Sequence, residues 1–109
     1  MVYNGIIEGH SFEETIEVIE NIKKIELVNR KIEYSDNIKI ALFVFEKFYL
    51  RTNSTAAMTV FIVEKEGKVH VNLTVSGFEA GILRIGFCSD RAFIDMITYE
   101  LEQLGIKEA

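Results

Sequence analysis

Residues 38–50, with the sequence IKIALFVFEKFYL, have the pattern of a β-strand that is apolar on both faces. Successive side chains of a strand point to opposite faces of a sheet. One face would carry Ile38, Ile40, Leu42, Val44 and Phe48, and the other Ala41, Phe43, Phe45 and Tyr49. A half-exposed antiparallel strand would alternate apolar with polar residues. This strand therefore needs cover on both sides, which points to a partner chain or an apolar ligand.

The composition indicates one globular domain, spanning residues 1–109. The chain is 49% hydrophobic and 27% charged, which is enough apolar material for a real core. A length of 109 residues fits a single domain and leaves no room for a second.

The charge balance and the distribution of apolar residues bound the partners and the location. With 17 acidic and 12 basic residues, the net charge is −5, which argues against a general nucleic-acid binder. No basic segment precedes an apolar run at the N-terminus, and no run of about 18 apolar residues exists. We therefore expect neither a signal peptide nor a membrane span, and a cytoplasmic location.

Two segments have helical periodicity. Residues 11–25 open with Ser11 and Glu14, a capping box. Their apolar residues are spaced three or four apart: Phe12, Ile16, Ile19, Ile22 and Ile25. Residues 90–104 carry a second apolar stripe, and Gly105 stands where a left-handed helix stop belongs. We predict a helix over each segment.

Strands are predicted between and around these helices. The expected ranges are 2–8, 27–34, 38–50, 56–64, 68–76 and 82–87. Glu66-Gly67 is predicted to close a two-residue hairpin. The strand at 27–34 is short and charged, as is typical of a sheet edge. The sequence therefore predicts an α+β fold in the order β-α-β(4-5)-α: an antiparallel sheet of five to six strands with two helices on one face.

The element order, Phe43–Lys47 of the central strand and the closing segment FCSDRAFIDMITYELEQL resemble a known family. It is DUF6054, a family of small uncharacterised bacterial domains common in Firmicutes. The resemblance covers nearly the whole chain and implies an α+β single domain of bacterial origin. It implies no activity, and no residue inherits a role from it.

Residues with metal or nucleophilic chemistry are few. His10 precedes the first helix, His70 lies on the polar face of the strand at 68–76, and Cys88 precedes the second helix. Their spacings match no zinc pattern, so we expect no metal and no cofactor. A solvated histidine and a buried cysteine are the simpler interpretations of these residues.

The start of the second helix is the one candidate for an anion site. Ser89 and Asp90 begin that helix, and Arg84 and Arg91 flank its start. Ordinary helix capping explains Ser89 and Asp90 more simply. An enzyme with a site at Arg84, Cys88, Ser89 and Asp90 remains an alternative, but no nucleophile has a recognisable activator, so we expect no catalytic residue.

The leading hypothesis is a domain that acts by association, as a homodimer through an apolar sheet face. The residues expected on that ligand or partner face are Phe43, Phe45, Tyr49 and Phe61, although the pattern leaves open which row of the strand at 38–50 the helices cover. One alternative is a module of the helix-grip type that binds a small apolar ligand. Another is a nucleic-acid module resembling half of the TATA-binding-protein fold, which the acidic charge disfavours.

Overall fold

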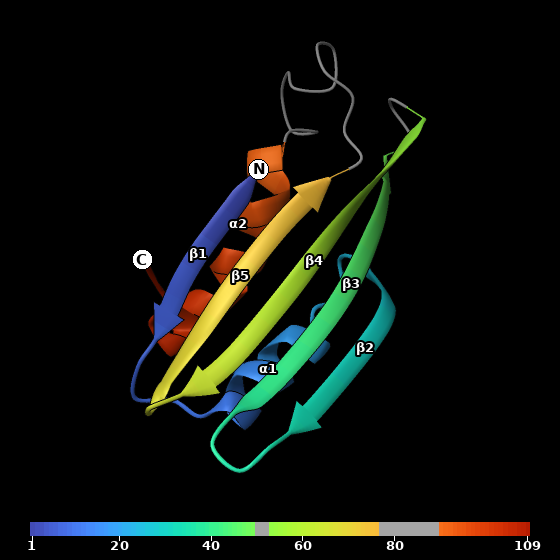
Figure 1. Cartoon of the computed structure of the whole chain (residues 1–109). Coiled ribbons are helices and arrows are strands. Elements are labelled where there is room, and N and C mark those ends of the chain that lie inside the picture. The colour runs from blue at the N-terminus through green and yellow to red at the C-terminus, as the bar shows by residue number, and fades with distance from the viewer. Residues whose placement is uncertain (50–52, 77–89) are drawn as a thin grey trace.

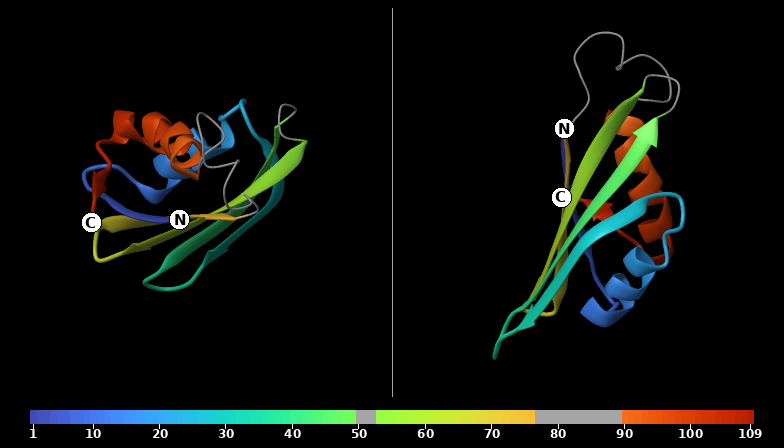
Figure 2. Two further views of the ribbon diagram at one scale, coloured as in Figure 1. Left: turned by 90° about the horizontal axis from the view of Figure 1, so that it is seen from above. Right: turned by 90° about the vertical axis from the view of Figure 1, so that its right-hand side faces the viewer.

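The computed structural model describes residues 1–49, 53–76 and 90–109 as one antiparallel sheet with two helices on one of its faces (Figures 1 and 2). The elements are β1 (Val2–Ile7), α1 (Phe12–Glu20), β2 (Glu26–Tyr34), β3 (Lys39–Tyr49), β4 (Ser54–Lys65), β5 (Lys68–Ser76), α2 (Asp90–Leu101), the 3-10 turn η3 (Glu102–Leu104) and β6 (Lys107–Glu108). The predicted α+β class is confirmed. The strand predicted at 82–87 lies outside the described residues.

The sheet has six strands in the order β2-β3-β4-β5-β1-β6, and all its pairings are antiparallel. The predicted edge position of the strand at 27–34 is confirmed, because β2 ends the sheet on one side. The other edge was not foreseen. There the last residues of the chain form β6 and pair with β1, so that Lys107 lies opposite Ile6 and the backbone amide of Ala109 donates to the carbonyl of Asn4 at 2.9 Å.

The core lies between the helices and the sheet face that they cover. The strand predicted at 68–76 is confirmed, and β5 alternates cleanly: it buries Val69, Val71, Leu73 and Val75 on that face. The helices supply Phe12, Ile16, Ile19, Phe93, Ile94, Ile97 and Leu101. These helical residues recur at the predicted spacing of three and four, which places them on the stripe of each helix that meets the sheet.

Helix α1 begins at the predicted capping box but ends earlier than predicted. Ser11 Oγ accepts from the Glu14 amide at 3.0 Å, and Glu14 Oε1 accepts from the Ser11 amide at 2.9 Å. The helix was expected to run to residue 25, yet it stops at Glu20. The hydrogen bonding changes at Asn21, whose backbone and side-chain amides both donate to the Glu17 carbonyl, at 3.2 and 2.7 Å. The next amide, of Ile22, donates to the Ile19 carbonyl at 3.3 Å, an i→i−3 bond that ends the α-helix. Ile25 is still buried, although it lies beyond the helix.

The end of the second helix matches its prediction. Gly105 adopts φ 72° and ψ 33°, the left-handed conformation expected of a helix stop. The amides of Gly105 and Ile106 donate to the carbonyls of Glu102 and Leu101 at 2.9 and 3.5 Å. The reversal aims the chain at β1, and Ile106 packs over Gly5 there: a Cβ built on Gly5 would lie 2.8 Å from Ile106 Cδ1. Gly5 thus provides the space that Ile106 occupies.

The hairpin between β4 and β5 has the predicted turn. Glu66 and Gly67 both have positive φ, 54° and 77°, as a type I′ turn requires. Lys65 and Lys68 pair directly across this turn. A two-residue turn fixes the register, so each residue of β4 from Ala57 to Lys65 has a defined partner on β5 and a defined face of the sheet.

The capping box should contribute to stability in a pH-dependent way. Ser11→Ala is expected to lower the free energy of unfolding by about 0.5–2 kcal/mol, and Glu14→Ala should act less than additively with it. The hydrogen bond from the Ser11 amide, then that from His10, lowers the pKa of Glu14. A lowered folded-state pKa gives stability that is present above the unfolded pKa and lost as the pH falls through the folded one. Thermal melts at neutral and acidic pH measure both effects.

Glu17→Ala is the matched control, since its side chain lies one turn further on, outside the capping box. Its effect on the melting temperature should be smaller than that of Glu14→Ala at neutral pH. Equal effects of the two changes, or fully additive shifts for the Ser11 and Glu14 pair, would show that the reciprocal cap is absent.

Gly5→Ala should displace Ile106 and loosen β6. An added methyl group in a packed site is expected to cost about 1–3 kcal/mol. Denaturant unfolding measures the loss, and amide hydrogen exchange should show faster exchange at Ala109. Ile106→Ala removes the obstructing atoms, so in its background Gly5→Ala should cost less. An unchanged penalty in that background would assign the crowding to Tyr3, whose ring also approaches the site.

Candidate functional site

The two apolar rows of β3 lie on opposite sides of the sheet. Phe43 and Phe45 are 0% and 1% exposed, and their rings stack with centroids 6.3 Å apart and planes at 16°. Both therefore belong to the core beneath the helices. Their expected place on a ligand or partner face is wrong, because Val60 and Met58, their neighbours on β4, also lie on the helix side.

The other row of β3 forms the centre of the uncovered face. Cross-strand pairing places Leu42 opposite Phe61 and Ile40 opposite Val63. We call the side of the sheet that the helices do not cover the open face. Its apolar centre comprises Ile6, Ile40, Leu42, Val44, Phe61 and Val63. Phe61 is 40% exposed, and the other five are half-buried. Figure 2 shows that both helices lie on the opposite side of the sheet.

A polar ladder lies beside this apolar centre, on β5 and β1. Asn72 Nδ2 donates to Asn4 Oδ1 at 2.8 Å, and Thr74 Oγ1 donates to Asn72 Oδ1 at 3.1 Å. His70 is the next residue of the same β5 row and lies opposite Val63. The open face thus has an apolar half on β3 and β4 and a polar half on β5, which Asn4 of β1 joins.

The open face is hollowed near the end of β4. The hollow has a volume of about 300 Å³ and its lining includes Asn4, Ile6, Phe61, Val63, His70, Asn72 and Ala109. Its apolar lining comes mainly from β4, whereas its polar lining comes from His70 and Asn72 of β5, Asn4 of β1 and Lys65 of β4. A single apolar side chain or a small apolar molecule could fill it.

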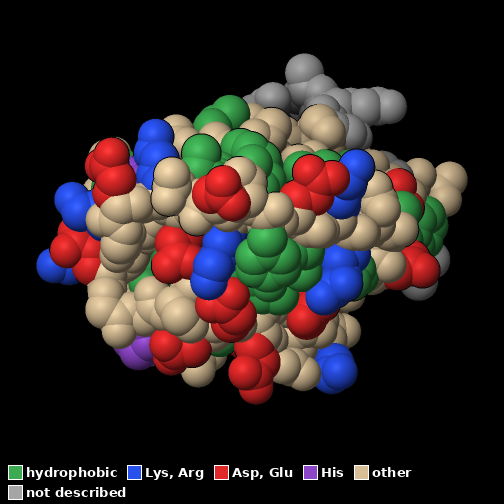
Figure 3. Space-filling model, turned by 60° about the horizontal axis from the view of Figure 1, so that its bottom comes forward, with side chains coloured by type: hydrophobic (Ala, Val, Ile, Leu, Met, Phe, Trp, Pro, Cys, Tyr) green, Lys and Arg blue, Asp and Glu red, His purple; other side chains and the backbone are tan. Residues whose placement is uncertain are grey.

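Charges of both signs border the open face. Lys31 and Glu33 lie on β2 opposite Leu42 and Ile40 and form an ion pair at 3.4 Å, while Lys65 and Lys68 flank the β4–β5 turn. Figure 3 shows the lower end of the molecule, where hydrophobic side chains are ringed by both basic and acidic groups. A phosphate backbone requires a surface of one sign, and this border does not provide one.

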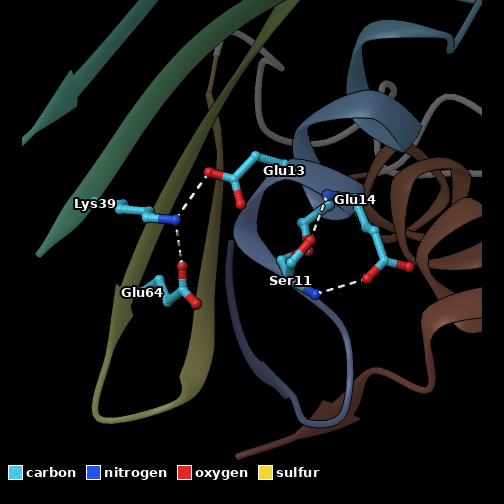
Figure 4. Close-up of polar contacts among 6 residues, drawn as sticks. Ser11, Glu13, Glu14, Lys39 and Glu64 are labelled. Atoms are coloured by element: carbon cyan, nitrogen blue, oxygen red, sulfur yellow. Dashed lines mark hydrogen bonds and ion pairs between the residues drawn. The ribbon is translucent and has the colours of Figure 1, made fainter.

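A second polar group lies at the start of α1, on the helix side of the sheet (Figure 4). Lys39 Nζ donates to Glu13 Oε2 at 2.9 Å and lies 3.7 Å from Glu64 Oε2. This hydrogen bond lowers the pKa of Glu13 and raises the pKa of Lys39. Lys39 also lies 5.8 Å from the ring centroid of Tyr34. The group ties α1 to β3 and β4, and a lysine held charged in this way is no proton acceptor near neutral pH.

A groove of about 330 Å³ lies between the two helices. Its lining includes the carboxylates Glu14, Glu17 and Glu100 beside Val18 and Leu104. Glu14 already accepts hydrogen bonds from the Ser11 amide and pairs with His10 at 3.0 Å. The carboxylates of this groove face solvent, as expected for the outer side of amphipathic helices.

Several predicted site residues lie outside the described part of the chain. Arg84, Cys88 and Ser89 fall in the segment 77–89, so the expected anion site and the alternative enzyme site are untested. Tyr49 ends β3 and Asp90 begins α2, but their side chains lie outside the description as well. The roles proposed for these residues remain predictions.

The histidines do not come together with other metal ligands. Within residues 1–49, 53–76 and 90–109, no group of three His, Cys, Asp or Glu side chains could hold a metal ion. Over the same ranges, no helix is long and apolar enough to cross a bilayer.

Comparison with known proteins identifies one family. A family of unknown function, DUF6054, matches residues 9–105. No curated protein and no solved structure matches the chain. The bacterial origin that the resemblance implied stays a prediction.

The assignment of the two rows can be tested by charge substitution. Phe43→Asp should unfold the chain, since truncating a buried Phe alone costs about 3–5 kcal/mol and an unpaired buried charge adds to this. Leu42→Asp should remain folded, because its side chain faces the uncovered side. Circular dichroism melts of both variants measure the difference. If Phe43→Asp melted cooperatively near the parent's temperature while Leu42→Asp did not fold, the rows would be assigned the wrong way round.

Proposed function

Because the chain belongs to DUF6054, a family to which no function is assigned, we propose its function from its own surface: the domain acts by association, and a second copy covers the open face. The observation that carries the proposal is the apolar row of Ile40, Leu42 and Val44 on the side of the sheet that the two helices leave uncovered. Phe61 at 40% exposure extends this row onto β4.

The area of the open face is adequate for a dimer. Strands lie about 4.8 Å apart and rise about 3.4 Å per residue, so the face from β3 to β1 measures about 20 by 27 Å, or about 500 Å² in projection. Side-chain relief raises the accessible area above this projection, toward the ~800 Å² per partner of a standard interface.

The sheet edges favour association through the face over strand addition. Every residue of β2 except Ile32 is exposed; the strand carries Arg30, Lys31 and Glu33 and has a register shift between Leu27 and Asn29. Charges and bulges are devices that keep an edge from pairing. The opposite edge is occupied in part by β6, which pairs with Gly5 and Ile6 of β1.

The alternatives have less support. A helix-grip binder needs a space between helix and sheet, but residues of the described core, such as Phe12, Phe43 and Ile97, fill that layer at 0% exposure. A nucleic-acid module needs a basic open face, whereas the centre is apolar and its border has both signs of charge. The hollow on the open face keeps a small apolar ligand as the second candidate.

Sedimentation equilibrium over a concentration series tests the proposal. The parent protein should be dimeric at micromolar concentration, and Leu42→Asp or Phe61→Asp should give a folded monomer, since each places a charge in the contact. Tyr99→Asp is the matched control: Tyr99 is 66% exposed but lies on α2, on the other side of the molecule, and its substitution should not change the mass.

A parent protein that is monomeric at high micromolar concentration would contradict self-association. Monomeric parent protein that binds an apolar dye at the hollow, with loss of binding on Phe61→Asp, would instead favour the small-ligand alternative.

A further inference from the structure

One aromatic side chain protrudes from the open face, away from its apolar centre. Phe48 is 54% exposed and lies near the end of β3, opposite Thr55. It shares the strand face of Leu42 and Val44, because residues two apart point the same way. A large exposed aromatic side chain on a sheet face is a typical anchor for a protein contact.

The hollow lies at the diagonally opposite corner of the same face. Its lining residues Val63, His70 and Ile6 belong to the end of β4, the start of β5 and the end of β1. Phe48 is level with the start of β4, whereas Val63 is eight residues further along that strand and level with Ile40. A protrusion and a hollow at opposite corners of one face cannot meet within one chain.

Two copies of the chain can bring these corners together. We propose that, in the dimer proposed above, on which this inference rests, each copy inserts Phe48 into the hollow of its partner. Consider two copies with their open faces together and a two-fold axis in the plane between them, perpendicular to the line from Phe48 to the hollow. Rotation about this axis places Phe48 of each copy over the hollow of the other. The same contact is therefore made twice.

The register places the centre of this arrangement over a small residue. Midway along β4 between Thr55 and Val63 stands Thr59, which lies opposite Val44 and Thr74 on the open face. A two-fold axis over Thr59 is closer to perpendicular to the strands than to parallel with them. Rotation about it therefore places the apolar strands β3 and β4 of one copy against those of the other. A small side chain at the axis lets the two sheets approach closely.

The hollow matches a phenyl ring in size and chemistry. Its volume of about 300 Å³ exceeds the ~150 Å³ of an apolar cavity known to bind benzene. Phe61 in its lining offers an aromatic partner, for which edge-to-face contact is favoured. The amide groups of Asn4 and Asn72 in its polar lining already bond each other, so an apolar ring entering there leaves that bond intact.

Photo-cross-linking tests the pairing directly. The variant Phe48→p-benzoylphenylalanine, mixed with isotope-labelled parent protein, should give intermolecular cross-links to residues 4–6, 61–65 or 70–72 after irradiation. The same amino acid at Tyr99 on α2 is the control and should give none. Cross-links from position 48 to position 48 of the other copy, or to β2, would overturn the pairing.

The affinity of the dimer gives a second readout. Phe48→Ala should raise the dimer Kd at least about 30-fold, which corresponds to a hot-spot loss of about 2 kcal/mol. Tyr99→Ala removes an aromatic ring of similar exposure from the helix side and should leave the Kd unchanged. Circular dichroism checks that both variants fold.

The two proposals fail in different ways. A dimer that Leu42→Asp dissociates but that Phe48→Ala leaves intact, with no cross-link to the hollow, would retain association through the open face and refute the Phe48 contact. A monomeric parent protein would refute both.

Discussion

The sheet carries apolar side chains on both of its faces, but the two helices cover only one face, and the rest of the structure depends on this difference. A sheet has two faces, and the two helices lie on one of them. The side chains that the helices meet form a close-packed layer, in which Phe43, Val60 and Leu73 align across three strands at 0% exposure. Burial of such residues dominates the stability of a small domain. The opposite row of β3 is apolar as well, and within the described chain no helix covers it.

The choice of covered face is set by strand register, which explains what the sequence could and could not predict. The two-residue turn at Glu66-Gly67 fixes β4 against β5, so Phe61 must share a face with Asn72 and the other polar residues of β5. That placement was within reach of sequence reasoning. The connection between β3 and β4 is longer and has no sharp turn signature. A shift of one residue there would exchange Leu42 and Phe43 between the faces, so the row holding Phe43 and Phe45 could not be assigned.

The ends of the elements show the same limit. The apolar spacing predicted a first helix that runs to Ile25, and Ile25 is buried, as that spacing implies. The helix nevertheless ends earlier, where the amide of Ile22 bonds the carbonyl of Ile19 in an i→i−3 turn. The strand β6 has two residues, too few for a periodic signal. Its position depends on Gly5, whose missing side chain leaves room for Ile106. Gly5 and Ile106 are about 100 residues apart in the sequence, so no local sequence pattern predicts their contact.

The open face differs from an ordinary solvated face because one of its halves is polar and the other is apolar. On β5 the outward residues are polar, and the Asn4, Asn72 and Thr74 side chains bond one another in addition to any water. The same sheet therefore accommodates polar side chains on this side, yet β3 and β4 carry Leu42, Val44 and Phe61 there. A partner could cover the polar half without orphaning the bonded amide groups. Burying the apolar half would supply the driving force for association, since the gain in free energy grows with the apolar area removed from water.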